Sequence, residues 1–202
     1  MRNFVPMNNM TQPLEVTCDN MLIIDADFAD KVAFDLIVNF ERIIGRPIPN
    51  ADLARWIDCL ALDGGIREGD NLTQVVLIHS KAKERLDYFT PAHLKDELHG
   101  KAFRDNLGEF AITAMSEETI ASRDQLALDT LQLALSAKEV KRIVMVPDEE
   151  YYDQVRRLLH HAGDDRPVTL LAMQPMPGGN FRQEILGYSL MSALGIRADE
   201  IR

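Results

Sequence analysis

Residues 143–163 read IVMVPDEEYYDQVRRLLHHAG, and this stretch indicates a strand that passes directly into a helix. Apolar residues run into Pro147, three acidic residues follow at 148–150, and two tyrosines then open a helix-like pattern. Acidic residues are favoured in the first turn of a helix, because its free N–H groups and its dipole attract negative charge. Carboxylates at the end of a strand are also ligands for divalent cations. The stretch is therefore compatible with a capped helix and with a metal site.

The same change from a short apolar run to a helical pattern recurs along the chain. Compact apolar runs predict strands, and apolar residues that return every three to four positions predict helices. The predicted strands are MLIIDAD (21–27), TQVVLIHS (73–80), GEFAITAM (108–115), KRIVMV (141–146) and PVTLLAMQ (167–174). Helices are predicted over 30–44, from an Asn50 cap to 62, from Pro91 onward, over 117–137, after residue 148, and near 183–194.

Strands that alternate with helices pair in parallel through right-handed crossovers. The pattern predicts a three-layer α/β/α sandwich with a mostly parallel sheet of about five strands. Residues 14–202 are predicted to form one domain, preceded by an irregular arm over 1–13 that is rich in Asn, Met and Pro.

Composition limits the classes of function. The chain has 202 residues, of which 46% are hydrophobic, and this is enough to bury the core of one domain. The net charge of -10 argues against a broad nucleic-acid surface, because phosphate binding needs local positive charge. Cys18 and Cys59 lie far apart and predict neither a zinc site nor a disulfide. The sequence has neither a signal-peptide pattern nor a long apolar segment, so we expect a cytoplasmic protein without a membrane partner.

Acidic residues follow two of the predicted strands. Asp25 and Asp27 end the first strand, and residues 148–150 follow the fourth. Ligands of open parallel sheets gather beyond the carboxyl ends of the strands, so these groups converge if the two strands are neighbours. Magnesium or manganese would relieve the repulsion between the carboxylates, could activate water, and could stabilise the charge that builds up on a phosphodiester. The predicted metal ligands are Asp25, Asp148 and Glu150.

The segment DTLQLAL (129–135) precedes IVMVPDEEY (143–151) with a spacing that resembles the NYN domains, members of the wider PIN-like nuclease group. The resemblance covers about residues 20–175 and implies a Rossmann-like fold and metal-dependent cleavage of RNA. In that resemblance Asp25 takes the first acidic position, Asp148 and Glu150 take the paired acidic motif, and Asp124 lies near the remaining acidic position.

Several positions depart from the pattern of that family. Val146 and Pro147 stand where the family has Ser-Gly, and Pro147 lacks the flexibility that lets a backbone approach a ligand. Glu150 replaces the second Asp of the motif, and Phe28 stands where the family has a polar residue. These departures favour a diverged or inactive relative.

Cationic and polar residues near the predicted crevice are candidates for binding a phosphate. His79 ends the second predicted strand, and Ser80, Lys81 and Lys83 follow it. Arg123 is a further candidate for contact with an anion. Neither GxGxxG nor GxxxxGK[ST] occurs, so no nucleotide cofactor is predicted.

Two functions follow from these observations. The first is a magnesium- or manganese-dependent phosphodiesterase acting on RNA, with catalytic residues Asp25, Asp124, Asp148 and Glu150 and substrate contacts from His79, Lys81 and Arg123. The second is a catalytically inactive Rossmann-like module that binds a protein or a small ligand, which the departures at Val146 and Pro147 and the net charge of -10 favour.

Overall fold

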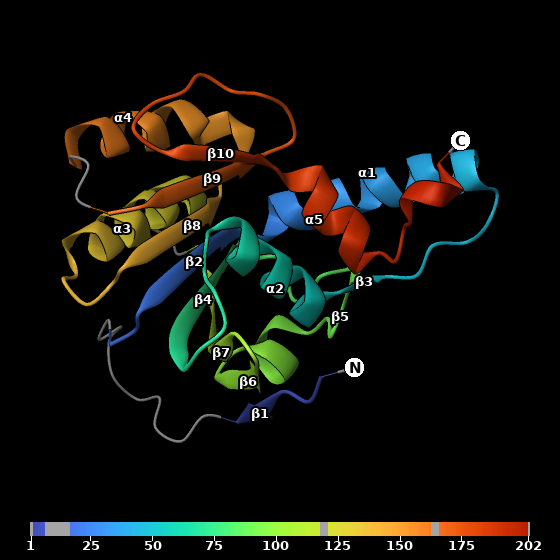
Figure 1. The fold of residues 1–202 in the computed structure, drawn as a ribbon, viewed down its shortest axis with the longest axis horizontal. Coiled ribbons are helices and arrows are strands. Elements are labelled where there is room, and N and C mark those ends of the chain that lie inside the picture. The colour runs from blue at the N-terminus through green and yellow to red at the C-terminus, as the bar shows by residue number, and fades with distance from the viewer. Residues whose placement is uncertain (1, 7–16, 118–120, 163–165, 202) are drawn as a thin grey trace.

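A mixed sheet runs through the computed structural model, which describes residues 2–6, 17–117, 121–162 and 166–201 (Figure 1). Among these residues the sheet has eight strands in the order β1-β6-β7-β4-β2-β8-β9-β10. The strands from β7 to β10 in this order are parallel, whereas β6 pairs antiparallel with β7 and with β1. Their bounds are β1 (Val5–Pro6), β2 (Asn20–Asp25), β4 (Asn71–His79), β6 (Lys101–Asp105), β7 (Gly108–Ser116), β8 (Arg142–Val146), β9 (Val168–Ala172) and β10 (Arg182–Ile185).

The five strands predicted from apolar runs are confirmed as β2, β4, β7, β8 and β9, but the prediction of about five strands was too small. The additional strands lie toward the two edges of the sheet, where fewer side chains are buried. β10 has the sequence RQEI without a fully buried residue, so it lacks the apolar run that marks a central strand. It occupies part of the segment that the sequence assigned to the last helix.

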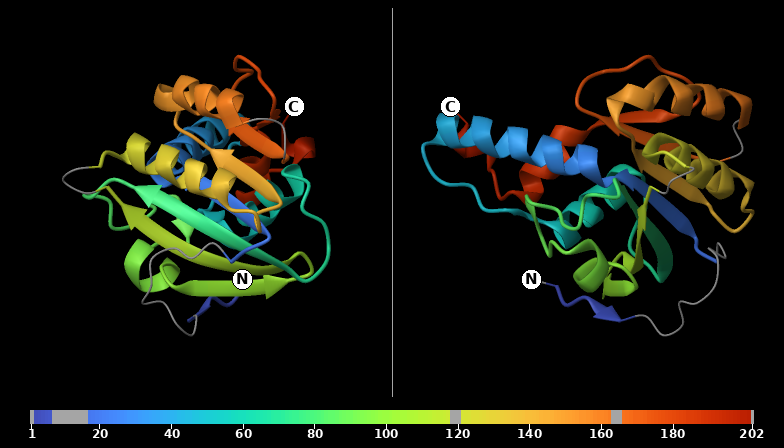
Figure 2. Two further views of the ribbon diagram at one scale, coloured as in Figure 1. Left: turned by 90° about the vertical axis from the view of Figure 1, so that its left-hand side faces the viewer. Right: turned by 180° about the vertical axis from the view of Figure 1, so that it is seen from behind.

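Helices cover both faces of the sheet, which gives the predicted α/β sandwich (Figures 1 and 2). The helices α1 (Ala26–Ile44), α2 (Leu53–Asp63) and α5 (Leu186–Ala193) pack on one face, and α3 (Arg123–Ser136) and α4 (Tyr152–Ala162) pack on the other. Side chains of a strand alternate between faces, so Leu22 and Ile24 of β2 join the first core while Met21 and Ile23 join the second. Every residue of β2 is buried because the strand is central.

Side-chain caps decide where two helices begin. α1 starts at Ala26 rather than near residue 30, because the Asp25 carboxylate accepts a hydrogen bond of 2.9 Å from the N–H of Phe28. The sequence predicted Asn50 as the cap of α2, but the structure shows that Asp52 caps this helix. Asn50 instead donates its side-chain amide to the carbonyl of Asp87.

Two other predicted helices differ from the structure. Directly before Pro91 the chain forms short β5 (Phe89–Thr90), which pairs with β3 (Ala51–Asp52). After Pro91 it forms a π-helix over Leu94–Leu98 in place of an ordinary helix. The helix expected over 117–137 begins at Arg123, and residues 118–120 lie outside the described chain. The 3-10 turn η2 (Glu149–Tyr151) precedes α4, and η3 (Ala198–Glu200) lies near the C-terminus.

The order of the strands indicates where a candidate functional site lies. Numbered along the chain, the six parallel strands lie in the order 3-2-1-4-5-6, so the chain turns back at β2 and continues on its other side with β8. In open α/β sheets of this kind, ligands bind beyond the carboxyl ends of the two strands that flank this switch point. Asp25 ends β2 and Asp148 follows β8, so both lie at that position.

Gly108 is required where β7 begins beside β4. Its φ is 119°, and a Cβ there would overlap the backbone of Asn71, its partner in the ladder. We expect Gly108→Ala to lower the free energy of unfolding by about 2 kcal/mol, since strain and overlap add together. Gly100→Ala is the control, because Gly100 also has a positive φ (69°) but has open space where a Cβ would lie. This control should lower the free energy of unfolding by about 1 kcal/mol. Equal losses in urea titrations would contradict the role of the contact with Asn71.

Candidate functional site

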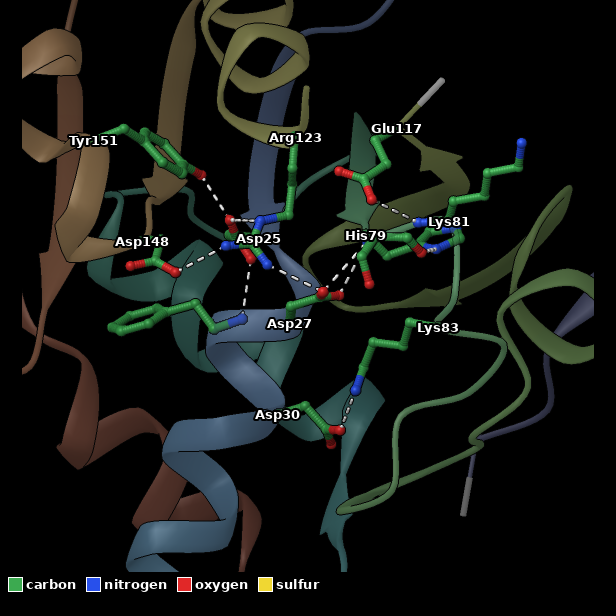
Figure 3. A network of polar contacts seen from close by, with 12 residues as sticks. Asp25, Asp27, Asp30, His79, Lys81, Lys83, Glu117, Arg123, Asp148 and Tyr151 are labelled. Atoms are coloured by element: carbon green, nitrogen blue, oxygen red, sulfur yellow. Dashed lines mark hydrogen bonds and ion pairs between the residues drawn. The ribbon is translucent and has the colours of Figure 1, made fainter. Parts of the chain in front are cut away.

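Arg123 lies among three aspartates at the carboxyl ends of β2 and β8 (Figure 3). Its Nε is 3.0 Å from Oδ2 of Asp25, its Nη1 is 3.0 Å from Oδ2 of Asp27, and its Nη2 is 3.0 Å from Oδ2 of Asp148. Each nitrogen of the guanidinium therefore faces a different carboxylate. We call these four residues the Arg123 cluster.

Asp25 is the buried member of the Arg123 cluster. Its residue is 1% exposed, and besides Arg123 it accepts hydrogen bonds of 2.9 Å from the N–H of Phe28 and from the hydroxyl of Tyr151. Burial raises the pKa of Asp25 to about 6, although the Phe28 N–H, Arg123 and Tyr151 all favour the ionised form. Around pH 6 this buried carboxyl group therefore changes its charge, while each of its oxygens has a hydrogen-bond donor.

Asp27 and Asp148 lie closer to the solvent. Asp27 stands in the first turn of α1 and accepts from the N–H of Ser80 at 3.2 Å, which ties it to the end of β4. Asp148 caps η2, because its Oδ1 accepts from the N–H of Glu150 at 3.0 Å while Oδ2 contacts Arg123. Asp148 thus caps a helical turn and belongs to the site at the same time.

Two of the predicted catalytic residues lie outside these contacts. The side chain of Glu150 is exposed, and it is the backbone N–H of Glu150 that donates a hydrogen bond to Asp148. Asp124 accepts a hydrogen bond from the hydroxyl of Ser122 at the start of α3, and this bond lowers the pKa of Asp124. Of the acidic residues predicted from the sequence, the structure brings Asp25 and Asp148 together and adds Asp27.

The predicted phosphate-binding residues also have internal partners. His79 ends β4, with its Nδ1 2.9 Å from the carbonyl oxygen of Ser80. Lys81 donates its backbone N–H to Glu117 at 3.2 Å, and its side chain extends away from the aspartates (Figure 3). Lys83 lies 2.7 Å from Asp30, a buried carboxylate of α1. Arg123, predicted as an anion contact, is surrounded by carboxylates.

A pocket of about 470 Å³ opens beside the Arg123 cluster, at the carboxyl end of β4. The loop after β4 forms most of its wall, and Asp27 joins it to the cluster. Its lining combines acidic, basic and hydroxyl groups: Asp27, Ser80, Ala82, Lys83, Glu84, Arg85 and Asp87.

The Arg123 cluster as arranged does not fit magnesium or manganese. Within the described part of the chain, no three His, Cys, Asp or Glu side chains are grouped so as to hold a metal ion. The guanidinium also contributes a permanent positive charge at the point where the carboxylates converge, and this charge repels a divalent cation. The arrangement suits a guanidinium, whose planar set of donors matches carboxylate oxygens.

Two members of the site were not assigned a role from the sequence. Asp27 follows Asp25 by two residues and lies in the first turn of α1, because this helix begins directly after β2. The sequence therefore contains a signal that places Asp27 beside Asp25. Tyr151 is given no role by the sequence, and its hydrogen bond to Asp25 follows from the pairing of β2 with β8.

None of the described helices combines the length and the apolar character needed to cross a membrane. No curated protein and no solved structure matches the chain. A protein family described as "Family of unknown function (DUF6621)" matches residues 16–201, which is most of the sequence, and the chain therefore belongs to this family.

Proposed function

We propose that this chain is a non-catalytic ligand-binding module on a Rossmann-like sheet, in which Arg123 takes the place that a metal ion would need. The observation that carries the proposal is the set of three contacts of 3.0 Å from one guanidinium to Asp25, Asp27 and Asp148. An arginine side chain stays protonated in proteins, so this counter-charge is present at every physiological pH.

Further donors hold each carboxylate in its position. The N–H groups of Phe28, Ser80 and Glu150 bond to Asp25, Asp27 and Asp148 respectively. A network in which every carboxylate has both a charged and a backbone partner suits a rigid support for a neighbouring binding site. It is less suited to a centre that must exchange ions and substrate in each turnover.

The pocket beside Asp27 supports a small polar ligand. It lies beyond the carboxyl end of β4, where open parallel sheets bind their ligands. Both charge signs line it, since Glu84 and Asp87 face it together with Lys83 and Arg85. A ligand that carries both an amino and an acidic group would find partners of each sign there, in exchange for the ion pairs of Lys83 with Asp30 and of Arg85 with Asp87.

A second candidate is the metal-dependent phosphodiesterase acting on RNA. The specific observation in its favour is that Asp25 and Asp148 converge from the adjacent strands β2 and β8 at the switch point of the sheet. For this function Arg123 would have to leave its three partners. The exposed side chain of Glu150 and the bond between Asp124 and Ser122 do not support it.

Titration of manganese, followed by calorimetry at pH 8, separates the two candidates. We expect no saturable binding of manganese to the wild type, because Arg123 occupies the point at which the three carboxylates converge. We expect saturable binding to Arg123→Met, because the three carboxylates then lack their counter-charge. The control is the double variant Asp25→Asn, Asp148→Asn, which should not bind. Saturable binding to the wild type that this control abolishes would contradict the module and favour the phosphodiesterase.

A further inference from the structure

The N-terminal arm, residues 2–6, lies against the edge of the sheet at β6 (Figure 1). Val5 pairs with Ala102 and Pro6 pairs with Lys101 in an antiparallel ladder. The ring of Phe4 meets the ring of Phe103 edge-on, with 5.3 Å between centroids. The arm is therefore bound through its backbone and through an aromatic side chain.

Arg2 completes this binding by contacting a pair of carboxyl groups. It forms ion pairs with Asp58 of α2 and with Asp105 at the end of β6, where its Nη1 lies 2.7 Å from Oδ2 of Asp105. Its guanidinium carbon also lies 5.6 Å from the centroid of the Phe103 ring. Arg2 thus meets two carboxyl groups and an aromatic ring.

The two carboxyl groups need a cation. The side chains of Asp58 and Asp105 are only 13% and 10% exposed, and Oδ1 of Asp58 has no hydrogen-bond partner in the described structure. Burial and the neighbouring Asp105 raise the pKa of Asp58 to about 7, whereas Arg2 opposes this rise. Two carboxyl groups in contact do not both ionise readily unless a positive charge compensates them.

Binding of an extended segment to a strand edge, with side chains read by specific pockets, is a recurring mode of peptide recognition. The arm shows the three elements of this mode in one short segment: strand pairing, an aromatic contact and an arginine between carboxylates. The arm lies outside residues 16–201, which the family match covers.

We propose that the β6 edge, with Asp58, Asp105 and Phe103, is a binding surface for extended peptides that carry an arginine followed two residues later by a phenylalanine, and that the chain's own arm occupies this surface in cis. The partner is a segment of another protein with this basic and aromatic character. The inference is independent of the Arg123 cluster and goes beyond the proposed function. A tethered arm acts at an effective concentration in the millimolar range, so a free peptide must compete with it.

The test uses a fluorescent peptide of sequence RNFVP, which copies residues 2–6, and fluorescence anisotropy with full-length protein. The main variant is Arg2→Ser, Phe4→Ser, which removes the side-chain contacts of the arm in cis. We expect it to bind the peptide at least about tenfold more tightly than the wild type does, since the competing arm is weakened. A peptide of sequence SNSVP serves as the matched control and should bind at least about tenfold more weakly than RNFVP.

A second set of variants tests the surface itself. Adding Asp58→Asn and Asp105→Asn to the arm variant should weaken RNFVP binding by about tenfold or more, because the charge-assisted contacts are lost. Circular dichroism confirms folding. If the double arm variant unfolds, Arg2→Ser alone is titrated, with the same expected order of affinities. Equal binding of RNFVP and SNSVP, or equal binding of RNFVP by the wild type and the folded arm variant, would overturn the proposal.

Discussion

Replacement of Arg123 by methionine is expected to lower the free energy of unfolding by about 3 kcal/mol at pH 8. Removal of one partner from a buried ion pair typically costs about 3–5 kcal/mol, because the remaining charge stays buried without compensation. The lower end applies here, since the Arg123 side chain is 23% exposed and its partners Asp27 and Asp148 can be partly solvated, whereas Asp25 cannot. Urea titrations at pH 8 measure the loss.

The loss for Arg123→Met should shrink at pH 5. Below its pKa of about 6, Asp25 is mostly protonated in the wild type, and without Arg123 its pKa would rise further. The buried carboxyl group is then neutral in both proteins, so less interaction is lost. Arg85→Met is the matched control, because Arg85 pairs with Asp87 at the surface, and it should change stability by less than about 0.5 kcal/mol at either pH. Equal losses for the two variants would show that the Arg123 cluster contributes no more than a surface ion pair.

Asp25→Asn should change the dependence of stability on pH. The pKa of Asp25 is raised from 3.8 to about 6 in the folded protein, so between these values the folded state binds more protons than the unfolded state. The free energy of unfolding therefore falls as the pH rises from about 4 to about 6, because the buried Asp25 must ionise, and the full loss is reached above about pH 6. About two pKa units correspond to about 3 kcal/mol.

Asparagine cannot ionise, and its carbonyl oxygen can still accept the bond from the N–H of Phe28. Relative to the wild type, Asp25→Asn should therefore gain up to about 3 kcal/mol between pH 4 and pH 8. Urea titrations across this range measure the difference.

Asp124→Asn provides a control of opposite sign. The pKa of Asp124 is lowered by its bond from Ser122, so its contribution is present above the unfolded pKa and is lost as pH falls. This variant should lose stability relative to the wild type as pH rises through the acid range. Parallel profiles of Asp25→Asn and the wild type from pH 4 to pH 8 would mean that Asp25 titrates as an ordinary carboxyl group.

The sequence alone identified some of the residues in these predictions, but it did not show which of them contact one another. Asp25 was found because an acidic residue directly after MLII stands at the end of a buried strand, and Asp148 because it follows IVMV in the same way. The ladder between β2 and β8 then brought them together. Arg123 is predicted from the sequence as a contact for an anion, and in the structure its guanidinium contacts three carboxylates of the chain itself. These neighbours cannot be recognised until the order of the strands is known.

The sequence by itself determined the central strands, because a strand that is buried on both sides of a parallel sheet consists of a short, continuous apolar run. It also indicated the acidic residues that follow β2 and β8, since caps and strand ends depend on a few adjacent residues. The tertiary structure alone decided the strands β6 and β10, which lie toward the two edges of the sheet, because partly exposed strands need no apolar run. It alone decided that Arg123 joins Asp25, Asp27 and Asp148, because charges that are distant in the chain meet only through the order of the strands.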